Sequence, residues 1–187
     1  MSHVLAGCPV ALQQGHYTWR HDSVLNKIAS FIKSDDSSVS VFCDANPRPW
    51  TIPPDILPTS CWPDLVVISK QKKLISILEL TVPYENNIQK EHEYKCQKYT
   101  HLAIDLTNCG YKVKFFAVEI GSRGLISKAN SNRLCAFYHS IHGSHFNAKD
   151  FRCLKRSLTK IAITASFIIY KARFQPTWCS TALLTNL

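Results

Sequence analysis

Two acidic residues lie at the adjoining ends of two short apolar segments near the middle of the chain. Asp64 precedes the segment 65–68 and Glu79 follows the segment 74–78, with fourteen residues between the two acids. β-Branched and aliphatic residues dominate both segments, which is typical of the strands of one hairpin, so Glu79 is expected to return close to Asp64. Converging carboxylates repel each other unless a positive charge lies between them, and a divalent metal ion commonly supplies it. The pair indicates a metal-dependent hydrolase, although either acid taken singly is more often a surface residue.

A lysine lies on the apolar face of the helix that is expected after this hairpin. The helix is predicted over about 86–108, and residues spaced by fours and threes share its inward face: Ile88, His92, Lys95, Tyr99, Leu102 and Leu106. A lysine that faces a core is costly unless a carboxylate pairs with it, and Asp64 and Glu79 are the natural partners. Two alternatives stay open. Lys95 extends along the apolar surface into water, or Lys98, about sixty degrees around the helix, takes its place.

The other elements follow from hydrophobic periodicity and from turn residues. The predicted segments are a helix over 19–33 with Thr18 as N-cap, a strand over 39–43, a proline-rich loop over 44–63, a strand over 111–120 after a Gly110 stop, a turn over 121–124, and helices over 130–140 and 149–174. This order predicts an α/β (α+β) fold in which helices flank a mixed sheet, with extra helices at the C-terminal end.

Composition narrows the class of protein further. The chain of 187 residues is 45% hydrophobic, which suffices for one domain with flexible ends. Its formal net charge of +9 favours an anionic partner, of which nucleic acid is the commonest. Eight scattered cysteines without a C-x-x-C pair fit neither a complete zinc module nor a disulfide framework, so an intracellular, reducing location is expected. The longest nearly apolar segment, 161–170, is too short to span a bilayer, and no membrane partner is expected.

A linked series of motifs resembles the C-terminal restriction-like endonuclease region of animal non-LTR retrotransposon polyproteins, within the PD-(D/E)XK nuclease superfamily. The similarity runs, with gaps, from His3 to about Trp178, and its motifs are 17–22, Pro63-Asp64, 77–85, 94–99 and 116–124. The resemblance implies a restriction-endonuclease-like core over 16–125, a helical cover over 126–178 and a flexible tail over 179–187.

The resemblance also implies roles for the residues already singled out. Asp64 and Glu79 would bind Mg²⁺ (or Mn²⁺), with the backbone carbonyl of Leu80 as a third ligand. Thr81 stands where the superfamily usually has a lysine; in this group a lysine on the following helix substitutes, here Lys95 with Lys98 in reserve. The reaction would be a nick in double-stranded DNA that leaves a free 3′-hydroxyl, which in an intact element primes reverse transcription. A nuclear location is implied, and element RNA is a further partner of the parent polyprotein.

Three other positions belong to these motifs. Arg20-His21-Asp22 resembles the Arg-His-Asp/Asn signature of the family; His21 is expected to face the core and Arg20 to be free for a phosphate, so DNA contact and helix packing both stay open. Arg123 in the 121–124 turn is a second phosphate contact. Trp62 replaces a residue that is more often basic in the family, and it could stack on a splayed base.

The N-terminal segment 1–15 resembles the remnant of a zinc knuckle. His3 and Cys8 match the last two ligands of the CCHC pattern, whereas its first two cysteines would precede Met1. A tetrahedral site cannot close with two ligands, so zinc is not expected here.

Three functions stay open at this point. The leading hypothesis is a retrotransposon-derived, Mg²⁺-dependent DNA endonuclease. The second is an inactive DNA-binding remnant of such an element, which the loss of the basic residue at Trp62 would favour. The third, a structural or interaction protein without nucleic-acid affinity, requires that the net charge be evenly dispersed.

Overall fold

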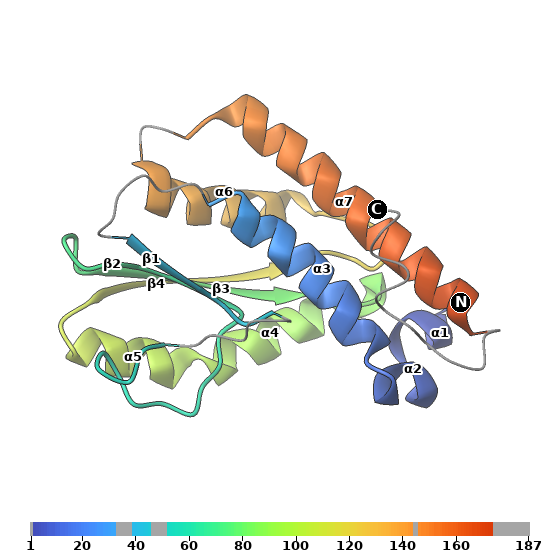
Figure 1. The fold of residues 1–187 in the computed structure, drawn as a ribbon, viewed down its shortest axis with the longest axis horizontal. Coiled ribbons are helices and arrows are strands. Elements are labelled where there is room, and N and C mark those ends of the chain that lie inside the picture. The colour runs from blue at the N-terminus through green and yellow to red at the C-terminus, as the bar shows by residue number, and fades with distance from the viewer. Residues whose placement is uncertain (1, 33–38, 46–51, 144–145, 174–187) are drawn as a thin grey trace.

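A single four-stranded sheet organises the molecule in the computed structural model, which describes residues 2–32, 39–45, 52–143 and 146–173 (Figure 1). Its strands are β1 Val39–Cys43, β2 Leu65–Ser69, β3 Leu74–Thr81 and β4 Lys112–Glu119, and they lie in that order across the sheet. β1, β2 and β3 pair antiparallel, whereas β3 and β4 run parallel. The mixed sheet that the sequence predicts is therefore confirmed.

The pleat of the two central strands separates two cores. Leu65 pairs with Leu78, and alternate residues of β2 and β3 point to opposite faces of the sheet. Leu65 and Leu78 belong to the larger core, whereas Val66 and Ile77 belong to the smaller one. Because Glu79 has the same parity as Ile77, its side chain is directed toward the smaller core.

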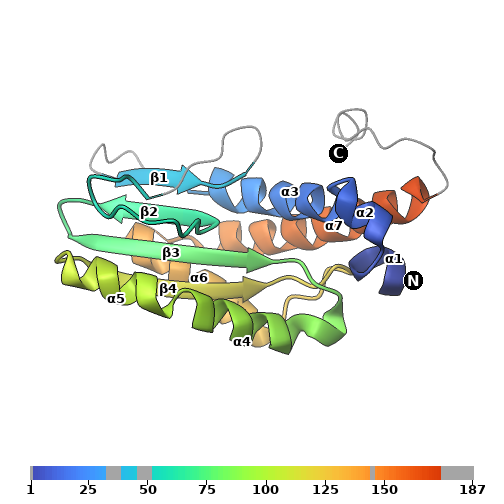
Figure 2. The same cartoon turned by 90° about the horizontal axis from the view of Figure 1, so that it is seen from below.

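Helices cover both faces of the sheet. α3 His16–Ser30, α6 Lys128–His142 and α7 Ala148–Ala172 lie on the side of the larger core, and α4 Ile88–Lys98 and α5 Thr100–Asn108 lie on the other side (Figures 1 and 2). The short helix η1 Glu85–Asn87 precedes α4 in the crossover from β3 to β4. None of the helices in the described ranges combines the length and apolar character that a membrane span requires.

The terminal segments join the same packed structure. α1 Ser2–Ala6 and α2 Pro9–Gln13 lie at the beginning of α3, and Leu5 packs with Trp19 of α3 and Ile169 of α7. Phe137 and Tyr138 of α6 belong to the larger core together with the sheet residues. The helical cover thus shares one core with the strands. Residues 174–187, which include the expected tail, lie outside the described ranges.

Several predicted helix boundaries differ from the observed ones. α3 begins at His16 after Gly15, whose φ of 73° suits glycine, so Thr18 lies inside the helix rather than at its N-cap. The helix expected over 86–108 is divided at Tyr99, where φ is −102° and ψ is 5°. The Tyr99 ring is buried and stacks on Phe115, and its hydroxyl donates to the Trp62 carbonyl, so tertiary contacts hold the break. The last described helix, α7, ends at Ala172.

Candidate active site

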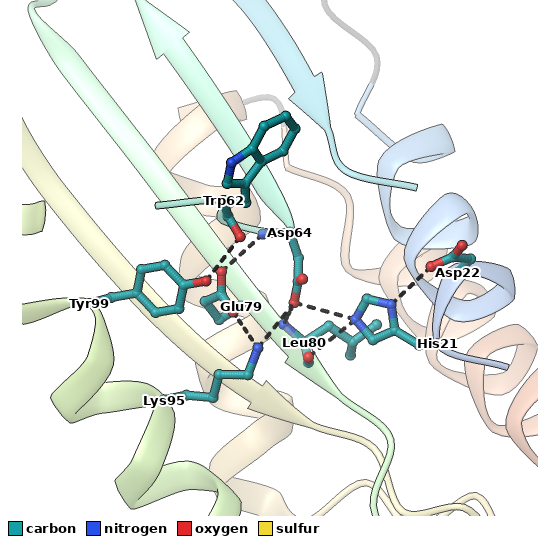
Figure 3. A network of polar contacts seen from close by, with 8 residues as sticks. All are labelled: His21, Asp22, Trp62, Asp64, Glu79, Leu80, Lys95 and Tyr99. Carbon is teal, nitrogen blue, oxygen red and sulfur yellow. Dashed lines mark hydrogen bonds and ion pairs between the residues drawn. The ribbon is translucent and has the colours of Figure 1, made fainter. Parts of the chain in front are cut away.

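Asp64 and Glu79 lie side by side where β2 begins and β3 approaches its end (Figure 3). Continuing the β2–β3 register by one residue places them opposite each other. The Asp64 backbone N–H donates to Glu79 Oε1 at 2.9 Å, and the Leu80 N–H donates to Asp64 Oδ2 at 2.6 Å. Residue exposure is 9% for Asp64 and 1% for Glu79. Two carboxylates are therefore fixed together with little access to water.

Lys95 of α4 completes the arrangement predicted from the sequence. Its Nζ lies 2.6 Å from Glu79 Oε2 and 3.9 Å from Asp64 Oδ2 (Figure 3). The alternative in which Lys95 extends into water is wrong, since its side chain is 16% exposed and paired. Lys98 is exposed, and its ammonium lies 4.8 Å from the centre of the Tyr99 ring. The structure thus brings Lys95, and not Lys98, to the carboxylates.

His21 of α3 reaches the same site, although it was expected to face the core. Its Nε2 lies 3.3 Å from Asp64 Oδ2 and 3.2 Å from the Leu80 carbonyl oxygen, and its Nδ1 lies 3.1 Å from Asp22 Oδ1. Sequence periodicity placed the side chain on the inward helix face without showing that this face meets the carboxylates. The adjacent Asp22 was the available signal that His21 would carry a proton.

The two carboxyl groups differ in their electrostatics. Burial alone would raise the pKa of Asp64, but the hydrogen bond and charge of His21, together with Lys95, lower it below the usual value. Burial and the charge of Asp64 raise the pKa of Glu79 to about 7, although Lys95 opposes that shift. Burial would lower the pKa of Lys95, but Asp64 and Glu79 outweigh it and raise that pKa. Lys95 is therefore a cationic hydrogen-bond donor, and Glu79 is the group closest to titration at neutral pH.

His21 makes the stability of the metal-free protein depend on pH. Burial opposes its charge, yet hydrogen bonds to Asp22 and Asp64 raise the pKa of His21 to about 9 from 6.5. A raised pKa stabilises the folded state fully below pH 6.5, and this contribution is lost as the pH rises through about 9. We expect urea unfolding in EDTA to show a loss of about 2 kcal/mol between pH 7 and pH 9.

Two variants separate this effect from other titrations. His21→Gln should flatten the pH dependence, whereas His101→Gln, at an exposed position of α5, should retain it. A His21→Gln protein that loses as much stability as the wild type between these pH values would contradict the assignment.

Two oxygens of the candidate site lie close to the same nitrogen of the His21 ring. Asp64 Oδ2 and the Leu80 carbonyl oxygen both lie within 3.3 Å of His21 Nε2. Glu79 Oε2 faces Lys95 on the other side of Asp64 Oδ2 (Figure 3). Carboxylate and carbonyl oxygens are the ligands that Mg²⁺ and Mn²⁺ prefer, so the donors fit such an ion.

Thr81 lies in β3 at the position where the motif resemblance led us to look for a lysine. It follows Glu79 by two residues and has the same strand parity. Its buried Oγ1 has no hydrogen-bond partner among the described residues. The positive charge near Glu79 is instead supplied by Lys95 from α4.

A cavity of about 290 Å³ leads to this site between α3, β3 and α4. Its lining includes His21, Leu80, Thr81, Glu91 and Lys95. The candidate site is consequently reachable from one side, although the carboxylates themselves are largely buried.

The Arg20 side chain is buried, whereas the sequence suggested that it is accessible to a phosphate. Its residue exposure is 3%, and its guanidinium donates to the carbonyls of Leu5 and Val82 and to Ser166 Oγ. The expectation of an accessible phosphate contact is therefore wrong, and Arg20 ties α1, the residue that follows β3 and α7 together. Its acceptors are contributed by segments far apart in the chain.

Arg123 and Trp62 keep exposed surface. The Arg123 side chain is 53% exposed, and its Nε donates to Glu85 Oε2 at 2.8 Å while the guanidinium lies 5.0 Å from the centre of the Tyr84 ring. Trp62 is 50% exposed beside Asp64, with its carbonyl bound by Tyr99. Both side chains can still meet a ligand that enters from solvent.

His3 lies within α1, and Cys8 lies between α1 and α2. His3 is exposed, and the Cys8 N–H donates to the Tyr17 hydroxyl at 3.0 Å. Within the described ranges, no three His, Cys, Asp or Glu side chains are arranged to hold a metal ion. His3 and Cys8 therefore belong to no such cluster there.

A further buried carboxylate, Glu119, was missed from the sequence. It ends β4, with Oε1 2.9 Å from His92 Nδ1 and Oε2 3.4 Å from the Arg133 guanidinium. The available signal was a lone acid at the end of an apolar strand, the same pattern as Glu79. This network lies next to the candidate site, because Glu119 pairs with Thr81 across β3 and β4.

Comparison of the sequence with protein-family models and with curated proteins finds no match.

Proposed function

We propose that the chain is a Mg²⁺-dependent DNA endonuclease that hydrolyses one phosphodiester bond of duplex DNA. The observation that carries the proposal is the convergence of Asp64, Glu79 and Lys95. The Lys95 ammonium lies 2.6 Å from Glu79 Oε2 and 3.9 Å from Asp64 Oδ2. These residues come from two strands and a helix. A restriction-endonuclease-like fold agrees with the mixed sheet and with the helical crossover between β3 and β4.

Asp64, Glu79 and the Leu80 carbonyl would hold the ion. Mg²⁺ in that position would stabilise the negative charge that develops on the scissile phosphate. Lys95 and His21 now neutralise these oxygens, so we expect both cations to turn partly toward the substrate when DNA binds.

Lys95 would orient the attacking water. Its raised pKa keeps it protonated, so it donates hydrogen bonds to water or phosphate and does not accept the proton. In the reaction the water oxygen forms a bond to phosphorus and the bond from phosphorus to the 3′-oxygen breaks. The proton that the attacking water loses passes to solvent, the departing 3′-oxygen takes up a proton and leaves as a hydroxyl, and the new 5′ end carries the phosphate.

The source and setting of this activity rest on the motif resemblance. A retrotransposon-derived nuclease would act in the nucleus on double-stranded DNA, with element RNA as a partner of the parent polyprotein. The exposed Trp62 and Arg123 are the described side chains that we assign to DNA contact. Arg20 is excluded from that role by its burial.

One observation favours an inactive DNA-binding remnant as the second candidate. His21 and Lys95 already compensate the carboxylates without a metal ion, and Thr81 leaves the usual lysine position without a charge. Such a protein would bind DNA in a salt-sensitive manner without cleaving it.

A plasmid-nicking assay decides between these functions. The purified 187-residue chain is incubated with supercoiled plasmid in Mg²⁺, in Mn²⁺ and in EDTA, and the open circular product is quantified. We expect nicking with either ion and none in EDTA. Plasmid binding without nicking in either ion would overturn the nuclease and support the remnant.

A further inference from the structure

The positive charge of the chain is concentrated in its last described third. Residues 124–173 contain one acidic residue, Asp150, against nine basic ones: Lys128, Arg133, Lys149, Arg152, Lys155, Arg156, Lys160, Lys171 and Arg173. The rest of the sequence is nearly balanced, with thirteen basic and twelve acidic residues. The positive charge is thus unevenly distributed along the chain. An even distribution was the condition for a protein without affinity for nucleic acid, and this condition is not met.

Four of these cations line a groove of about 690 Å³ beside α7. Arg152, Lys155, Arg156 and Lys160 face the loop that carries Gly124 and Leu125. None of the four forms an ion pair with any carboxylate in the described part of the chain. Asp150 lines a different cavity, beside Lys27 of α3. Nothing described there neutralises the groove, and an anionic ligand would do so.

The walls of the groove are fixed by hydrogen bonds. Thr159 Oγ1 of α7 donates to the Gly124 carbonyl at 3.1 Å, and Lys155 Nζ lies 3.0 Å from Ser131 Oγ of α6. Gly124 has a φ of 86°, and a Cβ there would come within 2.8 Å of Ile163. The loop therefore packs tightly against α7, which preforms the groove.

The exposed stripe of α7 changes from cationic to apolar along its length. Arg152, Arg156 and Lys160 are exposed and are followed at helical spacing by Ile163 and Phe167, which are 47% and 60% exposed. The stripe spans about 22 Å, since α-helices rise about 1.5 Å per residue. Cations followed by exposed apolar side chains suit a ligand that offers both phosphates and accessible base faces.

We infer that this α7 groove binds single-stranded nucleic acid, with its phosphates on Arg152, Arg156 and Lys160 and a base against Phe167, which lies beyond the groove on the same exposed stripe of α7. Duplex DNA hides its base faces, so Phe167 would contribute little to duplex binding. Arg152, Arg156 and Lys160 are exposed and would also attract an anionic membrane surface, so vesicle binding is the competing outcome of the test below. Phosphate charge and base stacking do not distinguish ribose from deoxyribose, so DNA and RNA strands should bind alike.

The groove is separate from the candidate active site. Its lining shares no residue with the cavity beside Lys95. α7 lies on the opposite face of the sheet from α4, which supplies Lys95 (Figure 1). Binding of a nucleic-acid strand can therefore be measured in EDTA, where the proposed nuclease is silent.

Fluorescence anisotropy with a labelled oligothymidylate of about 15 nucleotides tests the inference. The combined variant Arg152→Gln, Arg156→Gln, Lys160→Gln should weaken binding at least about tenfold and lower the slope of log affinity against log salt by about 2. The matched variant Lys70→Gln, Lys72→Gln, Lys112→Gln removes the same charge from exposed residues near the β2–β3 turn. It should weaken binding less than about threefold.

Phe167→Ala tests whether the ligand is a single strand. It should weaken strand binding about fivefold or more without changing the salt slope, whereas Leu12→Ala, at a 69% exposed position of α2, should not. Equal losses in both triple variants, or duplex binding as tight as strand binding, would overturn the inference. So would groove-dependent sedimentation with phosphatidylserine vesicles in the absence of oligonucleotide binding. Unfolding curves establish that every variant is folded.

Discussion

Asp64→Asn is expected to lower plasmid nicking in Mg²⁺ by about 10³-fold or more. The substitution keeps the shape of the side chain but removes the charge that would hold the ion, and several kcal/mol of lost transition-state stabilisation correspond to a rate change of this size. Asp64 is the carboxyl whose pKa is lowered by His21 and Lys95, so it is the one that is ionised at assay pH. Initial rates of open-circle formation measure the effect.

Asp55→Asn is the matched control for this substitution. Asp55 is exposed in the segment before β2, so its loss changes the net charge equally without touching the site. It should nick within about threefold of the wild type, as surface substitutions seldom perturb a distant site. If Asp64→Asn nicks as fast as Asp55→Asn, Asp64 is not a metal ligand and the nuclease assignment fails.

Lys95→Met and Lys98→Met should differ strongly in nicking. Methionine preserves much of the aliphatic stem, so each variant removes one ammonium group. Lys95 lies 2.6 Å from Glu79, whereas Lys98 lies over the Tyr99 ring at the surface. We expect a loss of about 10²-fold or more for Lys95→Met, which removes a donor from the reacting centre, and little change for Lys98→Met. Nicking rates at saturating Mg²⁺ provide the comparison.

The stability of Lys95→Met has to be measured beside its activity. Removing one partner of a buried pair costs about 3 kcal/mol or more when the other stays charged. Glu79 can limit this cost by taking up a proton, because its pKa is already raised to about 7. Nicking is therefore compared at a temperature at which urea curves show both variants folded. A folded Lys95→Met protein with wild-type nicking would remove Lys95 from the mechanism.

The positions of Asp64, Glu79 and Lys95 were predictable because neighbouring elements of the sequence determine them. A short turn fixes the β2–β3 register, so the spacing of Asp64 and Glu79 in sequence is enough to bring them together. The helical repeat after the hairpin then selects one face, and this face carries Lys95. Hydrophobic periodicity specifies such relations wherever an element is regular and half-buried.

Residues whose environment depends on distant segments could not be predicted in the same way. Arg20 is buried among Leu5 of α1, Val82 after β3 and Ser166 of α7, and no local sequence pattern predicts contacts with such distant segments. The break at Tyr99 has the same origin, since its hydroxyl binds the carbonyl of Trp62. The cationic stripe of α7 was also missed, because net charge alone does not locate a surface.

Helix α4, which carries Lys95, contacts the sheet through ion pairs and without a fully buried side chain of its own. None of the residues of α4, all of which lie in the described ranges, is buried. Its contacts with the strands include the ion pairs of Lys95 with Glu79 and of His92 with Glu119. Lys95, which is proposed to act in the reaction, is thus also an anchor of α4. Any ligand that draws Lys95 away from Glu79 would loosen this helix, so occupancy of the site and mobility of its wall are coupled.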